Sequence, residues 1–160
     1  MHSKIFQISE DPVDKEDYFE EERYMGKPWN FVGGIADYVD RITDDEMKAC
    51  IVWLGKDRST NGIMTDKWSR TISVFDKRAF FASKYEGFVK ALRNLSGITL
   101  DEFCTNKKTA YFCDLEYYFN DKYGIYMDSD EDGLLTLDEW VRHAKPGKKF
   151  YIGAVIDYHW

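Results

Sequence analysis

The segment from Phe150 to Tyr158 reads FYIGAVIDY, and its aromatic and β-branched side chains predict a strand well supplied with apolar residues. At the other end of the chain, the segment from Lys4 to Ser9 alternates apolar and polar residues and predicts a first strand. Strands at the two ends of a chain can pair in one sheet, and such pairing ties both termini down. We therefore expect the two terminal segments to share a sheet.

Helix signals lie between these strands. Asp14 is placed to cap a helix over Lys15–Tyr24, which would be rich in acidic residues near its N-terminus. Thr43 and Glu46 have the spacing of a capping box before an apolar run. This box predicts a second helix over 44–54.

A long amphipathic helix is predicted to start at Asp76 or at Ser83 and to end at Gly97. Its apolar residues recur at spacings of four and three, which is the pattern of a helix with one apolar face: Phe81, Tyr85, Phe88, Leu92 and Leu95. Another capping box begins at Thr99, and helix is expected to extend from it to Lys122, with an interruption near Thr105.

Two internal segments, 35–42 and 70–75, have strand composition. Strands mixed with helices, without a regular alternation of strand and helix, indicate the α+β class. No internal repeat and no long linker divides the chain. We predict a single domain over residues 1–160, with a small, mostly antiparallel sheet packed with about four to five helices.

Composition limits the class of protein. Hydrophobic residues make up 44% of the chain, which is enough for a packed core. The longest apolar run, Ala49–Leu54, is too short to cross a membrane, and the N-terminal segment lacks the apolar part of a secretory signal. We therefore expect a cytoplasmic protein without a membrane partner. Three cysteines are too few and odd in number for a disulfide framework.

The net charge of −7 is spread unevenly. Residues 1–54 carry −7, residues 55–100 carry +5 and residues 101–160 carry −5. An acidic protein disfavours direct nucleic-acid binding, because neutralising phosphates needs a positive surface. Acidic surface instead suits a basic protein partner.

Residues 128–139 read DSDEDGLLTLDE and resemble the calcium-binding loop of an EF-hand. The resemblance implies Ca²⁺ ligands from the side chains of Asp128, Asp130 and Asp132, the carbonyl of Leu134, Thr136 directly or through water, and both carboxylate oxygens of Glu139. Crowded carboxylates repel one another, and a hard divalent cation relieves that repulsion. We expect a structural Ca²⁺ here.

Two other interpretations of this loop stay open. Thr136 and Glu139 also form a capping box, which starts a helix with or without a metal. The segment Tyr123–Met127 has strand composition and Asp132-Gly133 is a hairpin-turn signal, so the loop can instead be the tip of a β-hairpin.

Other site chemistry is weak in this sequence. Cys104, Cys113 and His143 match no zinc-site spacing, so zinc is not expected. There is no phosphate-binding glycine motif and no recognisable catalytic set, which favours a protein that is not an enzyme.

The predicted helix over Lys15–Tyr24 offers a negatively charged surface that also carries aromatic rings, and aromatic residues favour interfaces. The candidate partner-binding residues are Glu16, Asp17, Tyr18, Glu20, Glu21 and Glu22. The leading hypothesis is a non-enzymatic binding module for a basic protein, for example an inhibitor that mimics nucleic acid against a nucleic-acid-handling enzyme. The alternative is a calcium-responsive regulatory protein, and an enzyme is the third hypothesis.

Overall fold

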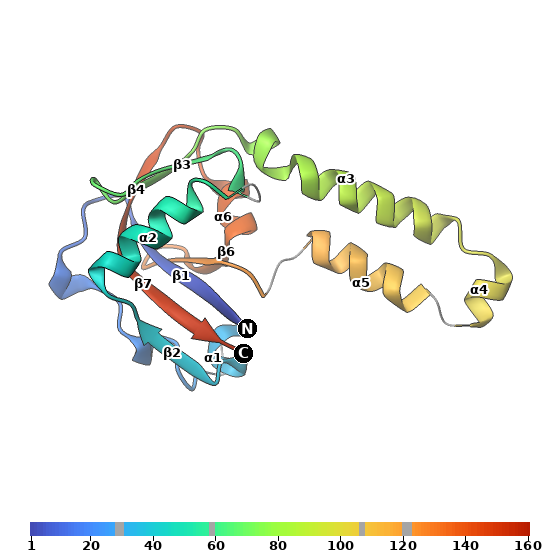
Figure 1. Cartoon of the computed structure of the whole chain (residues 1–160), viewed down its shortest axis with the longest axis horizontal. Coiled ribbons are helices and arrows are strands. Elements are labelled where there is room, and N and C mark those ends of the chain that lie inside the picture. The colour runs from blue at the N-terminus through green and yellow to red at the C-terminus, as the bar shows by residue number, and fades with distance from the viewer. Residues whose placement is uncertain (28–30, 58–59, 106–107, 120–122) are drawn as a thin grey trace.

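The computed structural model describes residues 1–27, 31–57, 60–105, 108–119 and 123–160. Its centre is a seven-stranded mixed sheet (Figure 1). The strands follow the order β3-β4-β7-β1-β5-β6, and β2 pairs with β7 as well. Their bounds are β1 His2–Ser9, β2 Tyr38–Arg41, β3 Ile63–Asp66, β4 Thr71–Val74, β5 Tyr126–Ser129, β6 Gly133–Thr136 and β7 Lys149–His159.

The two terminal strands lie side by side at the middle of the sheet, as the sequence predicts. β1 and β7 are antiparallel, with His2 opposite His159 and Ser9 opposite Tyr151. The eleven residues of β7 are long enough to pair with β4 near one end and with β2 near the other.

The prediction of a small, mostly antiparallel sheet is wrong in size and in type. β5 lies on the free side of β1 and runs parallel to it, with Ile5 opposite Tyr126 and Gln7 opposite Asp128. A parallel pair needs a long crossover, and here the crossover contains most of the chain. That distance along the chain is why local patterns gave no sign of the pairing.

The helices begin where the sequence signals lie. α2 spans Asp44–Leu54 behind the Thr43–Glu46 capping box, and α3 spans Lys77–Ser96 with the side chain of Asp76 as its cap. The remaining helices are α1 Phe31–Ile35, α4 Leu100–Cys104, α5 Lys108–Phe119 and α6 Leu137–His143. Lys122, the expected end of the helix after Thr99, lies outside the described residues.

The predicted helix over Lys15–Tyr24 is wrong. The segment forms two short 3₁₀ turns, Lys15–Asp17 and Glu21–Arg23, joined by extended backbone. The buried side chain of Gln7 donates to the carbonyl of Asp17 at 2.8 Å and accepts from the amide of Phe19 at 3.0 Å. These bonds take backbone groups that a continuous helix would need.

The predicted strand over 35–42 is correct only in its second half. α1 occupies Phe31–Ile35, and the strand β2 begins at Tyr38. β2 is placed by pairing with β7, a contact 115 or more residues away along the chain, which its own composition cannot specify.

Both faces of the sheet are buried. Ile5 and Phe6 are neighbours in β1 but belong to opposite apolar clusters, and so do Tyr126 and Met127 in β5, because strand side chains alternate between faces. α2 and α6 cover the face of Phe6, whereas α1 and the second 3₁₀ turn cover the face of Ile5. The core is therefore three layers deep around a central sheet.

Helices α3, α4 and α5 form an arm that projects from the sheet (Figure 1). α5 packs back along α3 so closely that a Cβ on Gly87 would lie 2.4 Å from the ring of Tyr118. Of the twenty residues of α3, only Phe80 and Ala91 are buried. The helix predicted from the apolar stripe is confirmed, but its stripe is only partly covered. In the described part of the chain, no helix is both long and apolar enough to cross a membrane.

Candidate functional site: an acidic groove

A groove of about 390 Å³ runs between the 3₁₀ segment and the tip of the β5–β6 hairpin. Its apolar wall comes from Ile8, Pro12, Val13 and Phe19, and its acidic rim comes from Asp17, Asp130 and Glu131. The three acids are exposed to solvent. The fold thus brings together two acidic segments that are more than 100 residues apart in the chain.

Arg23 fixes the two sides of the groove to each other. Its Nε donates to Asp128 Oδ2 at 2.8 Å, and its Nη1 lies 3.4 Å from Asp130 Oδ1. The guanidinium carbon also lies 3.8 Å from the centre of the Phe19 ring, within the range of a cation–π contact. One cation therefore holds the hairpin, the 3₁₀ segment and the aromatic wall in place.

Asp128 is the buried centre of this network, with 2% of its side chain exposed. The hydroxyl of Tyr24 donates to its Oδ2 at 2.7 Å, beside the bond from Arg23. Burial lowers the pKa of Arg23, but the hydrogen bond and the charge of Asp128 outweigh it and raise the pKa overall. Arg23 therefore stays charged and balances the buried carboxylate.

Tyr24 makes the stability of this network depend on pH in the alkaline range. Burial raises the pKa of Tyr24 strongly, and the charge and hydrogen bond of Asp128 act in the same direction. In the unfolded chain a tyrosine ionises near pH 10. A raised folded pKa contributes stability below that value and loses it as the pH rises above it.

We therefore expect the free energy of unfolding to fall as the pH rises above about 10. Urea denaturation in a pH series checks this, with Tyr24→Phe as the comparison because phenylalanine does not ionise. The wild type should lose stability more steeply than the variant. Parallel losses in the two proteins would show that Tyr24 is not responsible.

The predicted calcium loop is a β-hairpin followed by a helix that starts at the Thr136–Glu139 capping box, so both of the other interpretations of the sequence describe it. β5 replaces an entering helix, and Asp128 and Leu134 are cross-strand partners in the hairpin. Gly133 has a φ of 72°, the left-handed conformation that favours glycine. Asp130 and Asp132 are exposed residues of the turn that joins β5 to β6.

The other proposed ligands have partners within the protein. Asp128 is bonded to Arg23 and Tyr24, while Glu139 Oε2 accepts from the amide and the hydroxyl of Thr136 at 2.9 Å each. Within the described ranges, no three His, Cys, Asp or Glu side chains are grouped so as to hold a metal ion. The guanidinium of Arg23 contacts two of the proposed ligands, Asp128 at 2.8 Å and Asp130 at 3.4 Å.

Calcium binding by this loop stays a prediction, and Arg23 gives it a sharp test. A cation at Asp128 must displace the guanidinium, so Arg23→Gln is expected to bind Ca²⁺ more tightly than the wild type does. Isothermal titration calorimetry of both proteins with CaCl₂, and their melting temperatures with and without chelator, measure the difference. An absence of heat in both proteins would remove the calcium hypothesis.

The candidate partner-binding residues divide into exposed and buried ones. Glu16, Asp17, Glu20 and Glu22 are exposed, and Glu21 is half-buried. Tyr18 is buried and accepts a hydrogen bond from the guanidinium of Arg70, so it anchors the segment 15–24 to the core instead of being available to a partner.

Sequence reasoning missed the residues that organise the groove. Gln7 looks like an ordinary strand residue, and Arg23 looks like a lone cation among acids. The one available signal for Arg23 is that it stands at the end of an acidic segment and directly before Tyr24. No model of a protein family, no curated protein and no solved structure matches this chain.

Proposed function

We propose that this chain is a non-enzymatic binding module whose acidic groove receives basic side chains of a protein partner. The observation that supports this proposal is the pairing of an apolar wall with an acidic rim in one groove. Lysine and arginine have apolar stems and charged heads, and they bury the stem along apolar surface while the head stays near water. Val13 and Phe19 suit the stem, and Asp17 and Glu131 suit the head.

Exposed acidic side chains around the groove also favour a basic partner. Glu16, Glu20 and Glu22 stand exposed on the segment that forms one wall. A surface of one sign raises the rate of encounter with a partner of the opposite sign and makes that rate sensitive to salt. A nucleic-acid-handling enzyme has a basic surface of this kind, so inhibition of such an enzyme is one concrete form of the proposed function.

The test uses an unstructured peptide rich in lysine and arginine as the probe. The wild type is expected to bind it at low ionic strength and to lose it as salt is added, because screening shortens the range of the field. The double variant Asp17→Lys with Glu131→Lys should bind at least about tenfold more weakly, a difference of about 1.4 kcal/mol.

The matched control makes the same change of net charge at positions outside the groove. Glu86→Lys with Asp114→Lys reverses two exposed acids of the arm and leaves the groove intact. Weaker peptide binding by the groove variant alone supports the proposal. An equal loss of affinity in both variants would show that only the net charge of the protein matters. Binding that disappears on adding chelator would favour the calcium-responsive alternative.

A further inference from the structure

The arm carries apolar surface that the rest of the chain leaves exposed. Large apolar side chains on its helices have exposed fractions from 46% to 76%: Tyr85, Leu92, Leu100, Phe103, Phe112 and Tyr117. Two helices packed as a hairpin give each helix one neighbour, which is too few to cover an amphipathic face. The arm therefore resembles half of a four-helix bundle.

The root of the arm is a hollow with a basic rim. Phe81, Tyr85, Phe88 and Tyr118 line a groove of about 280 Å³ together with Arg142 and with Lys84, whose ammonium is paired with the buried Asp138. The Arg142 guanidinium lies 4.9 Å from the centre of the Phe81 ring. This groove suits an apolar group that is flanked by negative charge.

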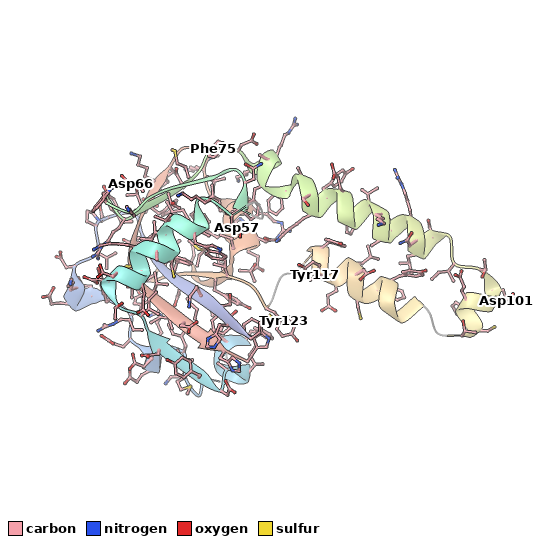
Figure 2. All side chains as sticks on the ribbon, in the orientation of Figure 1. Asp57, Asp66, Phe75, Asp101, Tyr117 and Tyr123 are labelled. Carbon is pink, nitrogen blue, oxygen red and sulfur yellow. The ribbon has the colours of Figure 1, made fainter. Side chains whose placement is uncertain are left out.

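The tip of the arm, formed by α4, carries apolar side chains flanked by negative charge. Figure 2 places Asp101 at the far end of the arm and Tyr117 near its root. Within α4, Leu100 is 76% exposed and Phe103 is 56% exposed, and the residues between them are Asp101 and Glu102. The tip is thus apolar and acidic, and the root is apolar and basic.

Charge is also divided between the helices of the arm. α3 contains five lysines and arginines and one acid, whereas α4 and α5 together contain four acids and one lysine. When two arms lie antiparallel, the basic α3 of one copy can face the acidic α4 and α5 of the other. A tip-to-tip arrangement would instead bring the acidic residues Asp101 and Glu102 of the two copies together.

We propose that a second copy of this chain covers the arm in a two-fold symmetric dimer. The acidic, apolar tip of each arm occupies the basic, aromatic groove at the root of its partner. Such an interface is self-complementary, so one contact is made twice. It forms a four-helix bundle from two hairpins.

The exposed apolar area is sufficient for a dimer of modest stability. Six exposed side chains at roughly 100 Å² each offer up to about 600 Å² per copy. Complete burial of all six in both copies would remove about 1,200 Å² from water, the lower end for specific stable interfaces, so this area is an upper limit for the dimer.

Sedimentation analysis over a wide concentration range is the first test, and it should show twice the chain mass of 18.9 kDa. Leu100→Ser with Phe103→Ser changes side chains that are already mostly exposed, so folding should be unaffected. This variant is expected to raise the dissociation constant of the dimer at least tenfold, roughly the effect of losing central interface contacts. The proposal is overturned if the wild type is monomeric at every concentration. It is also overturned if the tip variant has the same dissociation constant as the wild type.

Charge exchange distinguishes this arrangement from other dimers. Asp101→Arg and Arg142→Asp should each weaken self-association, because each brings like charges together at both contacts. A mixture of the two variants should form a heterodimer, in which one contact is reversed in sign and the other is that of the wild type. Circular dichroism should first show that both variants are folded. If the mixture of folded variants then associates no more strongly than either variant alone, the tip-to-root contact is excluded.

A cross-link gives a second readout that does not depend on charge. Cys104 lies at the end of α4, and Cys113→Ser leaves it as the thiol of the arm's tip. Adding Tyr85→Cys at the root should allow a disulfide between copies under mild oxidation with diamide. The Cys113→Ser, Cys50→Ser protein, which keeps Cys104 as its single thiol, should remain uncross-linked, and a cross-link in that control would indicate a tip-to-tip dimer and contradict the proposal.

Discussion

Replacing Lys84 with alanine is expected to lower the free energy of unfolding by about 3–5 kcal/mol. Lys84 Nζ lies 2.5 Å from Asp138 Oδ1, and only 2% of the Asp138 side chain is exposed. The other oxygen, Asp138 Oδ2, is buried and has no hydrogen-bond partner among the described residues. Without Lys84 this carboxylate would be a buried charge with no opposing charge at either oxygen.

Urea denaturation measures this loss, and two further variants define its cause. Lys48→Ala removes a lysine from an exposed pair with Asp45 and should cost at most about 1 kcal/mol. The double variant Lys84→Met with Asp138→Leu removes both charges, so it should recover most of the stability. A Lys84→Ala protein as stable as Lys48→Ala would show that the pairing of α3 with α6 through Lys84 and Asp138 does not stabilise the fold.

Replacing Arg23 with alanine is expected to cost about 3 kcal/mol or more, by the same mechanism at a second place. Asp128 would keep the hydroxyl of Tyr24 but lose its only charged partner among the described residues. Arg23→Lys should restore part of the loss, because lysine keeps the charge but cannot donate two bonds in the geometry of a guanidinium.

The control for this prediction is Arg41→Ala. Arg41 pairs with Glu20 at 2.5 Å, but both side chains are more than a third exposed, so this loss should stay below about 1 kcal/mol. Both variants remove one positive charge close to the acidic segment. Equal stabilities would therefore mean that the burial of Asp128 has little energetic effect.

The elements predicted correctly have signals that are local in the chain. The capping boxes at Thr43, Thr99 and Thr136 all form, because each joins residues three positions apart. The strands at the two ends were also predicted, since their composition is distinctive.

The failures concern contacts between distant segments. The side chain of Gln7 reshapes the backbone around Asp17 and Phe19, and the apolar stripe of α3 does not indicate whether it packs on the sheet or on another molecule. The groove follows the same rule. Asp17 was predicted as a partner-binding residue and Asp130 as a calcium ligand, whereas Glu131 was not predicted. The meeting of these acids depends on Arg23 and Asp128, which are 105 positions apart.

The position of β1 between β5 and β7 has a kinetic consequence. Both partners of this strand enter the chain more than 110 residues after it, so the central pairings close very long loops. Chains dominated by such distant pairings fold slowly, and during synthesis the unpaired edges of β1 remain open to misassociation. The arm is built from contacts much closer in sequence, so we expect it to become helical while the sheet is still incomplete.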